Sequence, residues 1–184
     1  MPGSRCCSGT PASDAAAYPR PVTGEYERIL AQNERFIEAF DRSALTAAPL
    51  RGIAILTCMD ARIDVEDALG LRVGDAHIIR NAGGLASADA IRSLVVSQQL
   101  LGTREIVVIA HTKCGLHRAD EAALRRRIED STGAATDMGF GAFDDLDAMV
   151  RRQVEILAAE GALLDVPIHG LVYEVDTGQL RPVA

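Results

Sequence analysis

Short apolar runs alternate along the chain with longer segments that repeat apolar residues every three or four positions. The apolar, β-branched runs predict buried strands at residues 52–57, 76–79, 105–110 and 167–175. A turn at residues 176–178 then predicts a short terminal strand. The three-to-four spacing predicts helices at residues 23–40, 64–69, 89–101, 119–130 and 143–160. Strands that alternate with helices predict an α/β fold, with a mostly parallel central sheet of about four strands flanked by helices.

The first residues of the chain differ in composition from the rest. Residues 1–22 are rich in Pro, Gly, Ser and Ala, which predicts a flexible N-terminal arm ahead of a single domain at residues 23–184. Cys6 and Cys7 lie in this arm, so we interpret them as incidental thiols. The helix expected next, with Thr23 as its N-cap, would suit dimer formation if it leaves the body of its own subunit.

Composition narrows the kind of core and the classes of partner. Hydrophobic residues make up 48% of the chain but aromatic residues only 4%, so the core must be aliphatic. The formal net charge of −7 argues against nucleic acids and anionic membranes as partners. No apolar stretch reaches the roughly 20 residues of a membrane span, and no secretory signal pattern is visible. We therefore expect a cytoplasmic protein whose cysteines stay reduced and serve a metal or catalysis.

Two of the four cysteines stand where predicted strands end. Cys58 follows the run 52–57, and His111 and Cys114 follow the run 105–110. Two thiolates and an imidazole suit zinc, and three protein ligands leave the fourth tetrahedral position to water, as in catalytic sites. We expect one Zn²⁺ per subunit, which lowers the pKa of its bound water to about 7.

Other interpretations of the same residues stay open. Taken alone, His111 and Cys114 could be a core histidine and an inert buried thiol. His117, three residues beyond Cys114, could compete as a metal ligand. The addition of Cys58 at an equivalent strand end favours the metal site.

Asp60 and Arg62 follow Cys58 closely. Their side chains are predicted to orient the zinc-bound water. An arginine can hold a carboxylate through two hydrogen bonds, which keeps the carboxylate ionised. Asp60 would then accept a hydrogen bond from the zinc-bound hydroxide and fix the lone pair that attacks the substrate. If Arg62 released it, Asp60 could instead occupy the fourth metal position. The alternative is a plain ion pair at a helix N-terminus.

Three blocks of the sequence resemble the β-class carbonic anhydrases, above all the small bacterial members. They are Cys58–Arg62, His77–Gly84 and His111–Gly115, in the order and spacing of that family. The resemblance extends over nearly all of the predicted domain. It implies reversible hydration of carbon dioxide to bicarbonate, with the three side chains named above as zinc ligands and the Asp–Arg pair as the catalytic dyad.

The resemblance also implies an assembly and a substrate pocket. It points to an obligate homodimer or homotetramer with an apolar pocket near the subunit interface. Ala82 and Gly83 would border the metal, and Gly115 could offer a backbone N–H to the substrate. Arg72 stands where plant-type members carry a substrate-binding Gln, and Lys113 where small members often carry an acidic residue. These two departures leave the substrate contacts open.

Two alternative functions accompany carbon dioxide hydration. The carbonyl sulfide and carbon disulfide hydrolases resemble β-carbonic anhydrases and keep the same ligands and dyad. The same site could therefore hydrolyse those compounds to hydrogen sulfide and carbon dioxide. A non-catalytic, zinc-stabilised binding protein is the third hypothesis, and the intact pair of Asp60 and Arg62 argues against it.

Overall fold

The computed structural model describes residues 24–184, so the predicted N-terminal arm and its two cysteines lie outside the described residues. The chain divides into two compact units, Met1–Ala44 and Leu45–Ala184. A single catalytic domain over residues 23–184 stays a prediction.

Helix α1 (Glu25–Ile37) belongs to the first unit and follows the helical pattern of the sequence. Its N-cap is Gly24, with φ of 100°, rather than Thr23, which lies outside the described residues. The left-handed conformation of Gly24 starts the helix without a side-chain cap, which the sequence rule did not anticipate. The apolar positions of this helix are exposed: Tyr26, Ile29, Leu30, Phe36 and Ile37.

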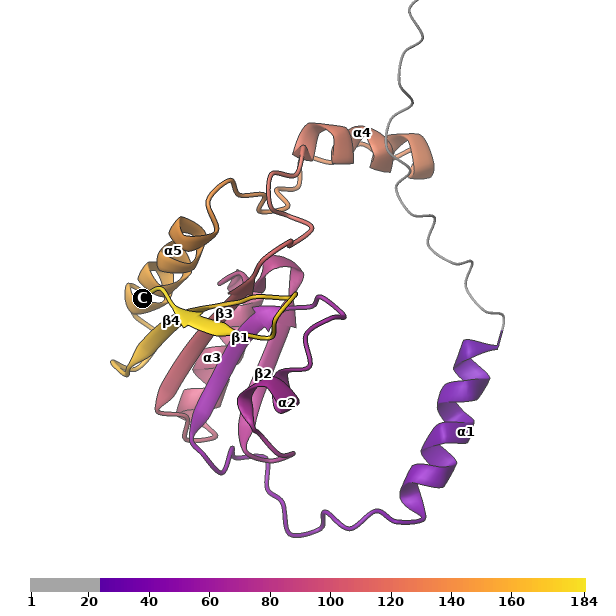
Figure 1. Ribbon diagram of the computed structural model, residues 1–184, viewed down its shortest axis with the longest axis vertical. Helices are drawn as coiled ribbons and strands as arrows, with labels where there is room; N and C mark the ends of the chain where they lie inside the picture. The colour runs from indigo at the N-terminus through magenta and orange to yellow at the C-terminus, as the bar shows by residue number, and fades with distance from the viewer. Residues whose placement is uncertain (1–23) are drawn as a thin grey trace, which may run out of the picture. The chain divides into compact units, whose positions relative to one another are not determined.

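Within residues 24–184, five strands form one sheet in the order β2-β1-β3-β4-β5 (Figure 1). Their bounds are β1 (Ile53–Cys58), β2 (Ala76–Asn81), β3 (Glu105–His111), β4 (Ile168–Tyr173) and β5 (Leu180–Pro182). Strands β1 to β4 run parallel, and the short β5 pairs antiparallel with β4. The predicted α/β fold with a mostly parallel sheet is confirmed.

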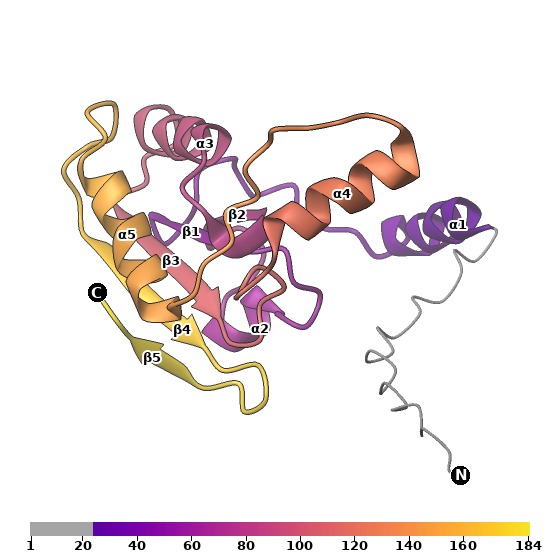
Figure 2. The same ribbon diagram turned by 90° about the horizontal axis from the view of Figure 1, so that it is seen from above.

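Helices pack on both faces of the sheet (Figure 2). α2 (Val65–Leu69) packs on one face, and α3 (Ala88–Gln99) and α5 (Leu146–Ala158) pack on the other. The 3-10 turn η1 (Ala82–Gly84) directly follows β2, whereas α4 (Glu121–Thr132) has no buried residue and extends away from the sheet. Leu56 lies in a buried cluster with residues of α3 and α5, whereas Ile55 lies in a cluster with a residue of α2. Leu56 and Ile55 lie in different clusters because successive side chains of a strand point to opposite faces of the sheet. No helix between residues 24 and 184 has the length and apolar character to span a membrane.

The helix starts in the second unit are fixed by polar residues of the sequence. Asp64, Ser87, Asp120 and Asp145 are the N-caps of α2 to α5, and each side chain accepts a hydrogen bond from a backbone N–H three residues later. Such a cap contributes about 1 kcal/mol to helix stability. These caps define where the loops that follow β1, β2 and β3 must end.

The strand register brings the carboxyl ends of β1 and β3 together. Thr57 of β1 pairs with Ile109 of β3, and the Thr57 hydroxyl donates to the Ile109 carbonyl at 2.8 Å. Cys58 is the last residue of β1, and His111 is the last residue of β3. The two side chains therefore leave neighbouring strands at the same edge of the sheet.

Gly84 lies where the chain passes against the end of β1. Its φ is +66°, and a Cβ would lie 3.0 Å from the Thr57 carbonyl carbon and 3.1 Å from the Cys58 nitrogen. Gly84→Ala is expected to lower the free energy of unfolding by about 3 kcal/mol, because the left-handed backbone and the contact both oppose a methyl group. Urea denaturation measures this change.

Gly102→Ala is the matched control for Gly84→Ala. Gly102 has a similar φ of +80°, but nothing lies within 4 Å of the position its Cβ would take. The free energy of unfolding of Gly102→Ala should therefore fall only by the cost of the left-handed backbone conformation, about 1 to 2 kcal/mol. Equal losses in the two variants would contradict the role given to the contact with β1.

Candidate metal centre

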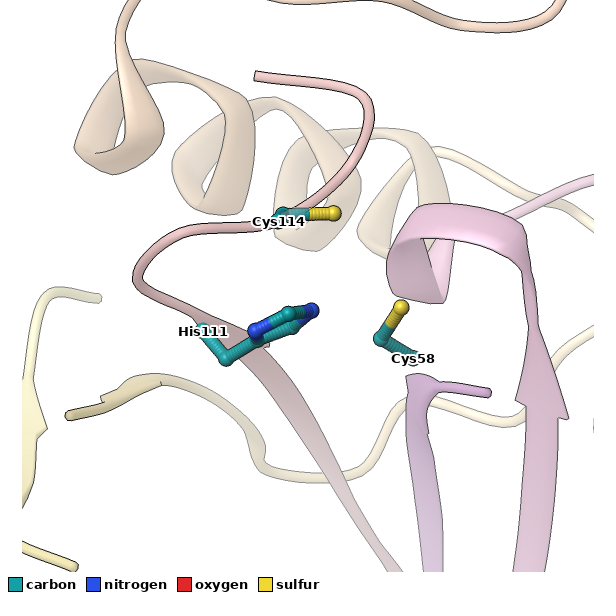
Figure 3. Close-up of side chains that lie close together, drawn as sticks. All are labelled: Cys58, His111 and Cys114. Atoms are coloured by element: carbon teal, nitrogen blue, oxygen red, sulfur yellow. The ribbon is translucent and has the colours of Figure 1, made fainter. Parts of the chain in front are cut away.

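Cys58, His111 and Cys114 come together at the carboxyl edge of the sheet, as Figure 3 shows. Cys58 ends β1, His111 ends β3, and Cys114 lies on the turn that follows. One ligand atom of each lies within 4.8 Å of the others, and all three residues are buried. This is the grouping that the sequence predicted from the two strand ends.

His111 presents one ring nitrogen to the two sulfurs. Its Nδ1 lies 2.9 Å from the Thr112 carbonyl oxygen. A carbonyl oxygen only accepts, so Nδ1 carries the proton and Nε2 keeps its lone pair in the neutral ring. Nε2 is buried and has no hydrogen-bond partner among the described residues. A buried lone pair of this kind is costly unless a cation uses it, and a backbone carbonyl on Nδ1 is the usual support of a metal-binding histidine.

The two thiols also fit a cation. The hydrogen bond from the Cys114 thiol lowers the pKa of Cys58, whereas the same contact raises the pKa of Cys114. Two buried thiolates this close together would repel one another, which favours a single ionised thiol. A divalent cation removes that repulsion and favours two thiolates. Two sulfurs and an imidazole nitrogen at this spacing therefore fit zinc.

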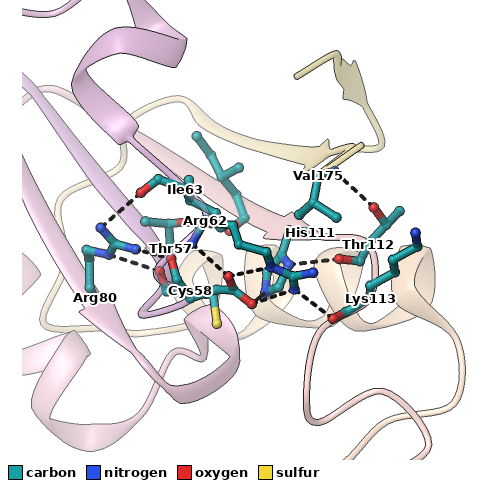
Figure 4. A network of polar contacts seen from close by, with 11 residues as sticks. Thr57, Cys58, Arg62, Ile63, Arg80, His111, Thr112, Lys113 and Val175 are labelled. Carbon is teal, nitrogen blue, oxygen red and sulfur yellow. Dashed lines mark hydrogen bonds and ion pairs between the residues drawn. The ribbon is translucent and has the colours of Figure 1, made fainter. Parts of the chain in front are cut away.

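Asp60 is held by Arg62 through both carboxylate oxygens. Figure 4 shows Arg62 in the network of polar contacts beside Cys58 and His111. Arg62 Nε donates to Oδ1 at 2.9 Å and Nη2 donates to Oδ2 at 2.7 Å; the Arg62 backbone N–H adds a bond of 3.0 Å. These bonds hold the pKa of the Asp60 carboxyl well below its usual range. Oδ2 also lies 3.7 Å from Nε2 of His111. An ionised carboxylate thus stands beside the candidate metal ligands.

Lys113 has contacts that the sequence did not reveal. Its φ is 55°, in the left-handed region, and its carbonyl accepts a hydrogen bond of 3.0 Å from Arg62 Nη2. Its ammonium group pairs with Asp176, in the turn after β4, at 2.7 Å. The positive charge predicted near the site is therefore paired, and the backbone of Lys113 holds Arg62 in place.

The residues predicted to border the substrate differ in exposure. Gly83 is buried, and its backbone helps to lower the pKa of the Cys58 thiol. Ala82, Gly115 and Arg72 are exposed. Apolar side chains including Ile63, Leu116 and Phe143 pack in the cluster that contains the two cysteines. The substrate contacts of Ala82, Gly83 and Gly115 stay predictions.

His117 does not join the cluster of candidate ligands. Its ring stacks on Phe143, with centroids 5.5 Å apart, and its Nε2 donates to the Asp144 carbonyl at 3.0 Å. The group within ligand distance consists of Cys58, His111 and Cys114. The alternative in which His117 competes as a ligand therefore has no support from the geometry of the described residues.

The comparison with known sequences finds two kinds of enzyme. A family model described as carbonic anhydrase matches residues 53–138. β-Carbonic anhydrase 1 of Mycobacterium tuberculosis is 38% identical over 163 residues, which is 88% of this chain and 98% of that protein. A carbon disulfide hydrolase of Saccharolobus solfataricus is 40% identical over 159 residues, which is 71% of this chain and 76% of that protein.

The comparison with solved structures agrees. The carbonic anhydrase of Streptococcus mutans matches with a TM-score of 0.83 and 38% identity, covering 89% of this chain and 99% of that one. Sequence and fold are thus shared over almost the full length of relatives whose names describe enzymes. The chain belongs to the β-carbonic anhydrase family.

Proposed function

We propose that this protein is a zinc enzyme that reversibly hydrates carbon dioxide to bicarbonate and a proton. One observation carries the proposal: an ionised carboxylate, clamped by Arg62, lies 3.7 Å from the unpaired nitrogen of a buried Cys–His–Cys group. A purely structural metal site would not need this pair. The 38% identity to β-carbonic anhydrase 1 over nearly the whole length of that protein supports the same activity.

Each residue of the site has a role in this proposal. Cys58, His111 and Cys114 hold the metal, which when bound acts as a Lewis acid and lowers the pKa of a coordinated water. The Asp60 carboxylate would accept a hydrogen bond from the attacking water and so orient its lone pair toward the substrate carbon. Arg62 keeps the Asp60 carboxylate ionised and directed into the site. The apolar residues packed around the cysteines suit a small non-polar substrate.

Hydrolysis of carbon disulfide or carbonyl sulfide is the second candidate function. The observation that favours it is the 40% identity to the carbon disulfide hydrolase of Saccharolobus solfataricus. These substrates are also linear molecules with an electrophilic carbon, and water attacks that carbon in the same way. The ligands and the dyad therefore serve either reaction, and the loops around the site select the substrate.

The proposed assembly is a homodimer or homotetramer with the active site near the subunit interface. Helix α1 supports it, because Tyr26, Ile29 and Ile37 are each at least 60% exposed. Apolar side chains at helical spacing on one element are typical of a surface that is covered in an assembly.

The experiment that tests the function compares three substrates on one purified, zinc-loaded sample. Stopped-flow measurement of carbon dioxide hydration is run beside consumption assays with carbonyl sulfide and carbon disulfide. Hydration well above that of the apoprotein, with much slower sulfide release, is the expected result. Faster turnover of either sulfur compound would favour the hydrolase. Zinc binding without turnover of any of the three would favour the non-catalytic alternative.

A further inference from the structure

Arg80 is an arginine of β2 whose guanidinium donates hydrogen bonds to three backbone carbonyls at the end of β1 and in the loop that follows it. Nε donates to the Cys58 carbonyl at 3.0 Å, Nη2 to the Asp60 carbonyl at 2.7 Å and Nη1 to the Ile63 carbonyl at 3.2 Å. Figure 4 shows these contacts on the side of the loop away from Lys113. One planar group thus holds the loop at its beginning, its middle and its end.

The strand register explains why Arg80 can reach this loop. β1 and β2 are parallel, and Thr57 pairs with Arg80 while Cys58 pairs with Asn81. The pairing continues one residue further, because the Met59 N–H donates to the Asn81 carbonyl at 2.9 Å. Beyond that point the chain turns away toward α2, and Arg80 supplies the donors that a neighbouring strand no longer provides.

The loop carries two of the groups on which the proposed function depends. Cys58 offers a sulfur at the start of the loop, and Asp60 offers the carboxylate beside His111. Asp60 is therefore held at two places: Arg62 binds its carboxylate, and Arg80 binds its carbonyl. The contact with Arg62 fixes the side chain, whereas the contact with Arg80 fixes the backbone from which the side chain extends.

We propose that Arg80 is a positioning residue of the metal centre, which sets the place of Cys58 and Asp60 relative to His111 and Cys114 through the backbone of residues 58–63. The inference rests on the proposed metal site. Without the guanidinium, the loop keeps its covalent ends but loses three donors to its carbonyls. The Cys58 sulfur then meets the metal in a less defined geometry, and Asp60 can leave its place beside His111.

The chain contains a matched control. Arg104 also uses its guanidinium to hold backbone carbonyls, at 2.8 Å from Thr103 and 3.4 Å from Gln98. It stands directly before β3, at the opposite end of the sheet from the candidate metal centre. Arg104→Ala therefore removes a comparable set of contacts without touching the loop that carries Cys58.

The test compares Arg80→Ala and Arg104→Ala with the wild-type protein after cobalt or zinc loading. Visible absorption of the Co²⁺ form reports ligand geometry, and transfer of Zn²⁺ to a chromogenic chelator reports metal retention. Arg80→Ala is expected to change the cobalt bands and to lose zinc about 10- to 100-fold faster, the usual effect of removing a group that orients a metal ligand. Millimolar guanidinium ion should partly restore both properties, and Arg104→Ala should match the wild type.

Several results would overturn the inference. They are wild-type cobalt bands and zinc retention in folded Arg80→Ala, or equal changes in Arg104→Ala. If Arg80→Ala does not fold, Arg80→Lys takes its place, since lysine keeps the charge but not the fork of donors. Faster zinc loss is again expected, and wild-type behaviour of folded Arg80→Lys overturns the role. A wild-type protein that binds neither ion contradicts the proposed metal site itself, which is a different outcome.

Discussion

Cys114→Ser is expected to lose most of its zinc and, with it, the hydration activity. A serine hydroxyl stays protonated at neutral pH and is a poor ligand for this metal, whereas Cys114 offers a buried sulfur within 4.8 Å of the other two ligand atoms. Structural zinc sites bind with about 10 to 16 kcal/mol. If this free energy is divided equally among the four ligands of such a site, the loss of one ligand lowers the affinity for zinc roughly 100- to 1,000-fold.

The measurement for Cys114→Ser is the zinc content after dialysis against a weak chelator, by elemental analysis. Cys6→Ser is the matched control, because we interpret Cys6, in the N-terminal segment, as an incidental thiol. It should keep one zinc per chain. Full occupancy in Cys114→Ser, or equal zinc loss in Cys6→Ser, would show that the ligand set is wrong.

Asp60→Asn has the second large expected effect, and it should leave the metal in place. The amide keeps the size of the carboxylate but loses its charge and one acceptor, so the water is no longer oriented by an ionised group. We expect carbon dioxide hydration to fall by about 10²- to 10⁴-fold, the usual range for a residue in acid–base catalysis. Stopped-flow rates and zinc content are measured on the same sample.

Asp89→Asn is a suitable control for this variant. Asp89 also pairs with an arginine, Arg92, at 2.7 Å, but both side chains are largely exposed on α3 and belong to no metal cluster of the described residues. Its substitution should leave hydration unchanged, since an exposed pair contributes little. If Asp60→Asn retains zinc and hydrates carbon dioxide at the wild-type rate, this result contradicts the catalytic role proposed for Asp60 and Arg62.

Much of the fold was predictable because it depends on local pattern. The apolar runs around Ile55 and Val108 predicted β1 and β3, and the residue spacing predicted the helices that separate the strands. Errors fell at helix ends, as with Gly24, where backbone conformation rather than residue type decides the cap. The short terminal strand expected after the turn at residues 176–178 is present as β5, which pairs antiparallel with β4 at the edge of the sheet.

The candidate site was predictable for a related reason. In a parallel sheet the strands end at a common edge, so residues that directly follow β1 and β3 must lie near one another. That rule joined Cys58 with His111 and Cys114 although more than fifty positions separate them. Asp60 and Arg62, two residues apart, could pair whatever the rest of the fold does.

The sequence by itself thus determined the fold class, the grouping of Cys58 with His111 and Cys114, and the Asp–Arg pair, since each depends on residue periodicity, on strand ends that share one edge, or on short spacing. Tertiary structure alone decided what holds them in place. Lys113 meets Asp176 across 63 positions, Arg80 reaches three carbonyls of another strand's loop, and Gly84 packs against β1. These contacts depend on strand register and on the path of loops. No local pattern encodes either, because both are set by the packing of the whole chain.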